Sequence, residues 1–374
     1  ASNNTAIGAQ ALQVNTTGAE NTAIGANALD ANTTGEKNTA LGMHALSANT
    51  TGSQNVSIGR GSLGSNTTAS NNTALGYFAL QQNTEGTSNV ALGHSALTAC
   101  TTGSSNVAVG LNCLDANTTA SNNVGVGTSA LGATTTGASN TAVGHQSLLS
   151  NTTGTSNVAV GSNALDANNN GNNNTGIGKD ALTDLTNGSQ NTAVGSGAVA
   201  NTTTAANNVG VGFQALFANT TGTSNTAVGA NALDANTTAN NNTAIGKSSL
   251  TTNTTGTSNT GCGVDTLTLN TTGSNNTAVG RGALDANTTA DNNTSVGHHS
   301  LLSNTTGIAN SGFGYRALNS NTTAAYNIAV GVDSLLSNTT GTQNVAVGAF
   351  CLDANTTANY NTAIGHESLG ANTT

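Results

Sequence analysis

Charge, aromatic side chains and proline are all scarce in this chain of 374 residues, and each shortage excludes a class of protein. Only 6% of the residues are charged and 2% are aromatic, and Pro and Trp are absent. Six Lys and Arg in a chain of net charge -9 cannot neutralise a run of phosphates, so we exclude nucleic-acid binding. No apolar run approaches about 18 residues, so we expect no membrane insertion of this segment.

The chain begins Ala1-Ser2-Asn3-Asn4, which lacks the basic and apolar regions of a signal peptide. What the chain does have is 35% hydrophobic residues, mostly Ala, Val, Ile and Leu, recurring at fixed intervals. Disordered chains usually combine low hydrophobicity with high net charge, which is a different composition. The low complexity of this sequence therefore indicates a repeat.

An Asn returns every 17 residues from Asn4 to Asn361, in all 22 possible places, and 22 × 17 gives the full 374 residues. With this Asn as position 1, the consensus is N-[TV]-A-[VI]-G-x-x-[AS]-L-x-x-N-T-T-[GA]-x-x. Self-similarity at a fixed period is typical of repeat architectures. We interpret residues 1–374 as a single array of 22 coils, where a coil is one 17-residue unit and its residues are named by position 1 to 17.

The residue types favour an all-β fold, specifically a parallel β-solenoid (a β-roll). Gly at two corners, β-branched residues at positions 2, 4, 13 and 14, and Asn at positions 1 and 12 all disfavour a helix. Positions 1 to 5 alternate as a short strand does, with positions 2 and 4 on one face and the small position 3 on the other. We predict a second short strand at positions 8–9 or 12–14, and a stacking distance of about 4.8 Å per coil.

Invariant positions predict the interior of the coil. We expect the aliphatic residues at positions 4 and 9 to be buried, and the invariant Gly at position 5 to have positive φ or a close backbone neighbour. Position 15, which is Gly or Ala, requires a small residue, and stacked Asn side chains at positions 1 and 12 are expected to form amide ladders along the axis. The structural residues that we single out are Asn4, Gly8, Leu12, Asn21, Ile24, Gly25, Leu29, Asn32, Asn225, Val228, Gly229, Leu233 and Asn236.

Neither end of the array diverges from the consensus as a capping coil would. The last four residues followed by the first four read A-N-T-T-A-S-N-N, which also occurs internally at Ala116–Asn123. Two interpretations stay open: the chain is a window of a longer array, or copies of it stack end to end with their coils in register.

The segments Asn4-Thr5-Ala6-Ile7-Gly8 and Asn106-Val107-Ala108-Val109-Gly110 resemble the N-S-V-A-I-G motif of trimeric autotransporter adhesin heads. The longer unit at Asn140–Gly154 is similar to repeat arrays of bacterial and phage tail-fibre-like proteins, and the resemblance covers all 374 residues. It implies left-handed parallel β-rolls that associate as trimers outside the cell, on a cell surface or on a virion. The adhesin coil is shorter than 17 residues. The small residues at position 3 are consistent with close approach between the chains of a trimer.

Residues with catalytic or metal-binding chemistry are dispersed along the array. Cys100, Cys113, Cys262 and Cys351 have no metal-like spacing, and we interpret them as buried free thiols. The alternative is a disulfide between Cys100 and Cys113. Four His share position 6, but three or more coils separate them, and six Asp share position 10 with similar separations; these residues are His94, His145, His298, His366, Asp30, Asp115, Asp166, Asp234, Asp285 and Asp353. We predict no catalytic site, no metal and no cofactor.

The leading functional hypothesis is an extracellular structural or adhesive fibre, not an enzyme, that binds copies of itself and a host-surface or glycan ligand. The variable positions would supply its surface, and most aromatic residues fall there: Tyr77, Phe78, Phe213, Phe217, Tyr315, Tyr326, Phe350 and Tyr360. The alternative is an ice-binding solenoid, because Thr at positions 13 and 14 forms long ranks, of which only one would be exposed. A polysaccharide-degrading solenoid is disfavoured because the acids do not cluster.

Overall fold

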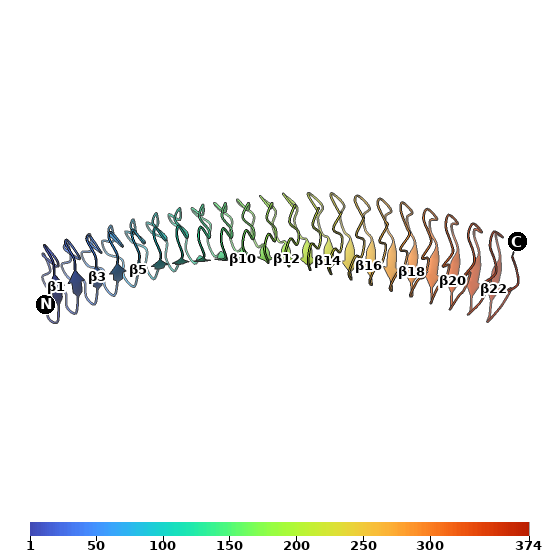
Figure 1. Cartoon of the computed structure of the whole chain (residues 1–374), viewed down its shortest axis with the longest axis horizontal. Coiled ribbons are helices and arrows are strands. Elements are labelled where there is room, and N and C mark those ends of the chain that lie inside the picture. Colours follow the sequence, from blue (N-terminus) through green and yellow to red (C-terminus); the bar gives the residue numbers. More distant parts are fainter. Residues whose placement is uncertain (374) are drawn as a thin grey trace. The chain divides into compact units, whose positions relative to one another are not determined.

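The computed structural model describes residues 1–373, which contain 22 strands of three residues each and no helix (Figure 1). The predicted all-β parallel solenoid is therefore confirmed. The chain divides into an N-terminal unit, Ala1–Ser189, and a C-terminal unit, Gln190–Thr374. Across residues 1–373 there is no helix with the length and apolar character needed to cross a membrane.

Every coil contributes one strand, at positions 2 to 4. The strands of the N-terminal unit are β1 (Thr5–Ile7), β2 (Thr22–Ile24), β3 (Thr39–Leu41), β4 (Val56–Ile58), β5 (Thr73–Leu75), β6 (Val90–Leu92), β7 (Val107–Val109), β8 (Val124–Val126), β9 (Thr141–Val143), β10 (Val158–Val160) and β11 (Thr175–Ile177). Those of the C-terminal unit are β12 (Thr192–Val194), β13 (Val209–Val211), β14 (Thr226–Val228), β15 (Thr243–Ile245), β16 (Thr260–Cys262), β17 (Thr277–Val279), β18 (Thr294–Val296), β19 (Ser311–Phe313), β20 (Ile328–Val330), β21 (Val345–Val347) and β22 (Thr362–Ile364).

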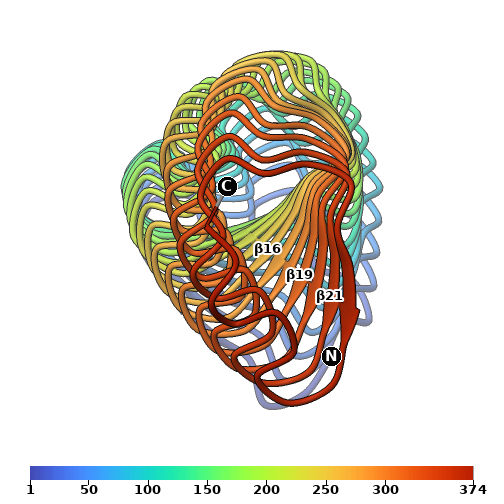
Figure 2. The same cartoon turned by 90° about the vertical axis from the view of Figure 1, so that its right-hand side faces the viewer.

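Within each unit, consecutive strands pair in parallel with a register of one coil. Thr5 lies opposite Thr22 and Ile7 opposite Ile24, and the same 17-residue offset continues from strand to strand. In the C-terminal unit, β16, β19 and β21 lie one behind another and fan out in the end view, as twisted sheets do (Figure 2). Like residues therefore form columns along each unit.

The second strand predicted in each coil is absent from the described residues, so that expectation was wrong. Positions 7, 9 and 17 have positive φ in coil after coil, as in Asn27 (φ 53°), Leu29 (φ 53°) and Lys37 (φ 59°), so the backbone there cannot be extended. The amides still bond along the axis: the Leu29 N–H donates to the Ala45 carbonyl of the next coil at 3.0 Å. The rest of the coil is thus a series of turns tied to its neighbours.

Two glycine columns differ in what they require. At position 5, Gly25 has φ of 131°, and a Cβ there would meet the Gly42 carbonyl carbon of the next coil at 2.7 Å. Both sequence-derived explanations of that position, positive φ and close backbone approach, therefore hold. At position 15, Gly35 has no positive φ, but a Cβ would crowd the Asn32 side chain. Ala69 is accommodated at the same position, which agrees with a requirement for a small residue.

Positions 3 and 4 face the opposite way from our expectation. Ala23 and Ala227 at position 3 are fully buried inside the coil, whereas Ile24 and Val228 at position 4 are half-exposed. The interior is narrow: Leu29, two Asn and several small side chains fill it, and Leu185 is buried only where it replaces the Asn at position 12. The small residues at position 3 consequently cannot form a face between chains, and that expectation is also wrong.

Candidate functional site

The Asn at position 1 forms the first predicted ladder. Asn21 donates its backbone N–H to the side-chain oxygen of Asn4 at 2.8 Å, and its own side-chain oxygen accepts the N–H of Asn38 at 2.9 Å. Its side-chain amide donates to the Gly35 carbonyl at 2.9 Å. Asn225 makes the equivalent bonds in the C-terminal unit. Each amide thus satisfies backbone groups that would otherwise be buried without partners.

The Asn at position 12 forms a second ladder, from side chain to side chain. Asn32 donates its amide to the side-chain oxygen of Asn15 at 2.9 Å and to the Gly35 carbonyl at 3.0 Å. The carbonyl of Gly35 therefore accepts one bond from each ladder. Both columns lie in the interior, where Asn21 and Asn32 are fully buried. They hold the narrow core together with hydrogen bonds as well as apolar contacts.

Position 9 combines burial with an unusual backbone. Leu29 and Leu233 are fully buried at φ 53° and 52°, and Leu12, in the first coil, has the same φ but is partly exposed. A left-handed Leu costs about 1–2 kcal/mol by itself, so it persists only where the neighbouring coils fix it. At position 5, Gly8 and Gly229 have positive φ, as Gly25 does, with values of 135° and 137°. No sequence signal marks position 9 as left-handed, because Leu rarely adopts that conformation.

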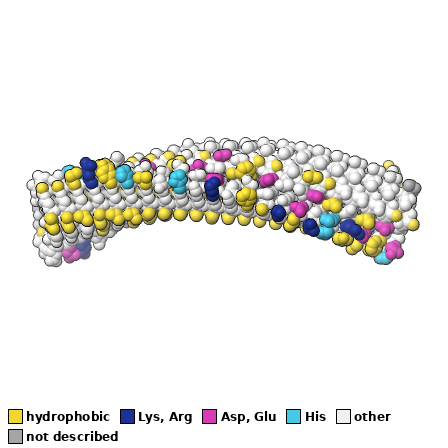
Figure 3. All heavy atoms as spheres, viewed as in Figure 1, with side chains coloured by type: hydrophobic (Ala, Val, Ile, Leu, Met, Phe, Trp, Pro, Cys, Tyr) yellow, Lys and Arg dark blue, Asp and Glu magenta, His cyan; other side chains and the backbone are white. Residues whose placement is uncertain are grey.

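The outward side chains of positions 2 and 4 form what we call the aliphatic ridge. Its residues are Thr, Val, Ser or Ile at position 2 and Val, Ile, Leu, Cys or Phe at position 4, and no coil has a charge at either. Figure 3 shows hydrophobic side chains in a row along the N-terminal unit. The most exposed members outside the first and last coils are Leu41, Leu75, Val90, Leu92, Val143, Val160, Ile177, Ile245, Val279, Phe313, Ile328 and Val330. Position 4 thus presents an uncharged apolar column on the outside of each unit, flanked by Thr or aliphatic residues at position 2.

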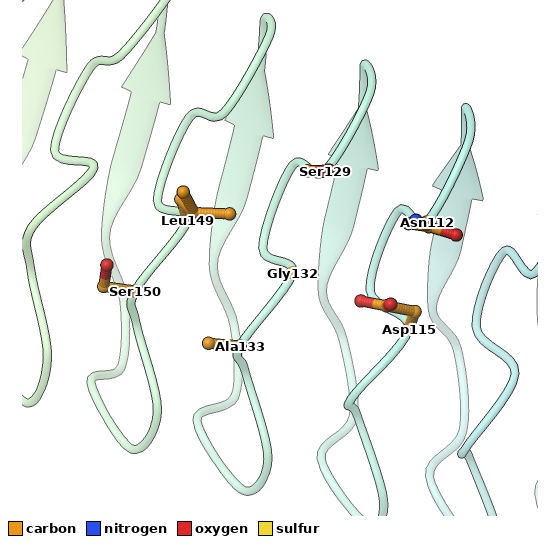
Figure 4. A pocket seen from close by; sticks show the side chains of 7 residues that line it. All are labelled: Asn112, Asp115, Ser129, Gly132, Ala133, Leu149 and Ser150. Carbon is orange, nitrogen blue, oxygen red and sulfur yellow. The ribbon is translucent and has the colours of Figure 1, made fainter.

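Surface recesses occur where position 10 is Gly. This happens at Gly64, Gly132 and Gly370, and each of these residues lines a pocket. Around Gly132 the recess measures about 360 Å³, and the larger position-10 residues of the neighbouring coils, Asp115 and Leu149, form its two sides (Figure 4). Glycine at this variable position is thus the sequence signal for a recess, which is not predicted in the sequence analysis above.

The only ionisable side chain lining the Gly132 recess is Asp115. Its pKa lies above the ordinary value because burial disfavours the carboxylate, although the backbone N–H groups of Asp115 and Ala116 partly oppose that effect. The other polar groups there are Asn112, Ser129 and Ser150. Over residues 1–373, no group of three or more His, Cys, Asp or Glu could hold a metal ion.

The cysteines are all free, so no Cys100–Cys113 disulfide forms. Burial raises the pKa of Cys100 to about 11 and that of Cys113 to about 12, and Cys351 is shifted in the same direction. These three are buried thiols, as predicted, with little thiolate at neutral pH. Cys262 is half-exposed because it stands at position 4, on the outward side of β16.

The two Thr ranks differ in exposure. Thr33, at position 13, is half-buried and donates its hydroxyl to the Thr50 carbonyl of the next coil at 3.0 Å. Thr34, at position 14, is exposed. The position-13 hydroxyls are therefore engaged with the backbone, whereas the position-14 rank faces solvent.

Comparison with protein-family models and curated proteins gives no relative from which a role could be transferred. No protein-family model matches the chain, and no curated protein matches it. The chain is therefore characterised by its own architecture: it is a β-solenoid repeat protein with stacked Asn ladders inside and an uncharged aliphatic ridge outside.

Proposed function

We propose that this chain is a structural and adhesive segment of an extracellular fibre, on a cell surface or a virion, in which left-handed coils associate as homotrimers. The aliphatic ridge is the observation that carries the proposal. Leu41, Ile245 and Phe313 are exposed by 44%, 43% and 41%, although the coil interior contains Asn. Burying this strip between copies of the chain would remove apolar surface from water without burying any charge.

The charge pattern supports the same conclusion. All 21 charged residues lie at positions 6, 7, 10, 11, 14, 16 or 17, away from the ridge. The resemblance of the N-T-A-V-G segments to trimeric adhesin heads favours three copies. An association through the ridge would leave the variable bend at positions 6 and 7 on the outside, where it could contact other molecules.

The test is the mass of the purified chain in solution, measured by light scattering with chromatography. We expect three times 36.3 kDa for the unchanged chain. Lys at three successive ridge positions, Val194→Lys, Val211→Lys and Val228→Lys, should produce the monomer mass, because a buried unpaired charge is strongly unfavourable.

The matched control places the same three charges at position 6 of the same coils, in Ser196→Lys, Phe213→Lys and Ala230→Lys, and should keep the trimer mass. A monomer at all concentrations of the unchanged chain would refute self-association. A control variant that dissociates as readily as the ridge variant would place the interface elsewhere.

A further inference from the structure

Three successive coils of the N-terminal unit stack a cation and two rings at position 6. Arg60 donates from Nη1 to the Tyr77 hydroxyl at 3.3 Å, and its guanidinium lies 5.7 Å from the centre of the Tyr77 ring. The Tyr77 and His94 rings are stacked with centroids 5.1 Å apart. The chain has 2% aromatic residues and six Lys and Arg, and a similar order, Arg281, His298 and Tyr315, occurs at position 6 of the C-terminal unit. Figure 3 shows hydrophobic, basic and His side chains gathered near the N-terminal end.

A recess of about 260 Å³ adjoins this stack. Gly61 and Gly64 replace larger side chains at positions 7 and 10 of one coil, and the preceding and following coils form the two sides. The lining also includes His44, Ser47, Arg60, Ser65, Phe78 and Gln81. It therefore combines one aromatic ring, one guanidinium, an imidazole and short hydrogen-bonding side chains.

Phe78 is held in place by its neighbours. Its ring covers Gly61 so closely that a Cβ on Gly61 would lie 2.6 Å from Phe78 Cδ1. The Phe78 carbonyl accepts the Thr98 hydroxyl at 3.1 Å, and the Phe78 N–H donates to the Arg60 carbonyl at 3.1 Å. The ring is thus a fixed side of the recess, which lowers the ordering cost of binding.

The guanidinium of Arg60 has no carboxylate partner among residues 1–373. Residues 38–84 contain no Asp or Glu, and Glu85, at position 14, is the only acid between residues 38 and 114. A second stack, in the C-terminal unit, shows the contrast: Arg316 lies over the Tyr315 ring, but Asp333 binds its guanidinium with two hydrogen bonds of 2.8 and 2.7 Å. The guanidinium of Arg60, unlike that of Arg316, is therefore available to an external anion.

We propose that the recess at Gly61 and Gly64 binds one residue of an anionic saccharide. The acid group, a carboxylate or a sulfate, pairs with the planar guanidinium of Arg60. The C–H face of the sugar packs on the Phe78 ring, whose negative face attracts electropositive hydrogens. Ser47, Ser65 and Gln81 supply hydrogen-bond partners for the hydroxyl groups. A volume of about 260 Å³ is smaller than drug-sized pockets and suits a single sugar ring.

This inference deepens the adhesive part of the proposed function, yet the recess is formed by one chain. The experiment is calorimetric titration of the full chain with four probes: a uronic-acid trisaccharide, a sulfated galactan trisaccharide, neutral maltotriose and triglutamate. The two acidic sugars distinguish a carboxylate from a sulfate as the recognised group. We expect at least one of them to bind, and maltotriose and triglutamate to bind more than tenfold more weakly.

Three variants locate the site. Arg60→Gln should weaken binding of the acidic sugar by about tenfold or more, because a charge-assisted bond is lost. Phe78→Leu keeps apolar volume but removes the ring face, and should weaken binding severalfold. Lys247→Gln removes one positive charge from the same coil position, away from any ring stack, and should leave binding unchanged.

The proposal is overturned by any of three results: no acidic sugar binds, triglutamate binds as tightly as the sugars, or Lys247→Gln weakens binding as much as Arg60→Gln. The solution mass of each variant is measured in parallel. A monomeric chain that still binds the acidic sugar through Arg60 would refute trimer formation and leave the saccharide site intact.

Discussion

The side-chain amide of Asn236 donates to the side-chain oxygen of Asn219, one coil earlier, at 2.9 Å. The same amide donates to the Ala239 carbonyl at 3.2 Å, and the Asn236 oxygen accepts the Asn253 amide at 3.1 Å. A fully buried Asn therefore joins three successive coils. Hydrogen bonding along this column therefore stabilises the coils in addition to the thin apolar core.

Replacement of Asn236 by Asp tests the ladder without changing side-chain size. Asp cannot donate either bond when ionised, and it would place a negative charge beside two oxygen atoms. We expect the free energy of opening of the surrounding coils to fall by about 2–4 kcal/mol. Hydrogen exchange of peptides within residues 208–259 measures it. The control is Asn241→Asp at the exposed position 17, and equal protection in the two variants would contradict a stabilising ladder.

Cys100 interrupts the position-12 ladder and leaves a defect. The side-chain oxygen of Asn83, one coil earlier, is buried without a hydrogen-bond partner, because Cys100 has no amide to offer it. Cys100→Asn should supply that donor and raise stability by about 1–2 kcal/mol. Thermal unfolding of the variant against the unchanged chain checks this. Cys100→Ser is close in size to Cys but has no amide and a shorter side chain than Asn, so it should give no comparable gain. A fall in stability with Asn would contradict the account.

Val199 is the single exception to Leu at position 9, and it is strained. It is β-branched at φ 53°, and its Cγ2 atom occupies the place that a Cβ on Gly210 would take in the next coil. Gly210→Ala alone should therefore destabilise the chain by about 1–3 kcal/mol.

In the presence of Val199→Leu, the same Gly210→Ala change should become neutral or stabilising, because the branch is gone and Ala restricts the unfolded chain. Denaturant midpoints of the two single variants and the double variant give the coupling energy. Additive effects of the two substitutions would show that Val199 and Gly210 do not share this space.

Asp115 predicts a pH dependence. Because its pKa is raised in the folded chain, the unfolded chain loses this proton first as the pH rises, and stability falls through the range above the ordinary carboxyl pKa. At a pH below the pKa of Asp115 in both the folded and the unfolded chain, the carboxyl group is protonated in both states and costs no stability. Asp115→Asn should therefore stabilise the N-terminal unit at pH 7 more than at pH 3. Denaturant midpoints at both pH values test the sign, with Glu85→Gln as an exposed control; a larger gain at pH 3 would refute it.

The period, the parallel pairing, the Asn ladders and the two glycine requirements could all be predicted from the sequence. Each depends on a residue, such as Gly25 or Asn32, whose chemistry leaves few alternatives. Which face of the strand points into the coil could not be predicted in this way. Alternation shows which residues share a face, but it does not show which face is inside. The size of Ile24 predicts an interior position, whereas the narrow coil accepts Ala23 instead.

The recesses and the left-handed positions were missed for different reasons. Leu29 at positive φ has no sequence signature, since neighbouring coils impose the conformation. The recess at Gly64 did have a sequence signature. Gly stands at a position where most coils have a larger residue, and it lies near Gly61 and two of the few aromatic residues. Each aromatic residue taken alone is only a contact candidate, and it is the 17-residue register that brings Arg60, Tyr77 and His94 together.

The central claim is that each 17 residues advance the chain by one strand spacing, and paired spin labels measure that advance directly. Cysteine labels at position 6 of two N-terminal coils, Ala26 with Thr128 and Ala26 with Ser162, span six and eight coils, in a chain whose half-exposed Cys262 is replaced by Val. We predict interlabel distances of roughly 29 and 38 Å, which is about 4.8 Å per coil. Distances that do not increase from the first pair to the second, or an increment far from one strand spacing per coil, would contradict the account.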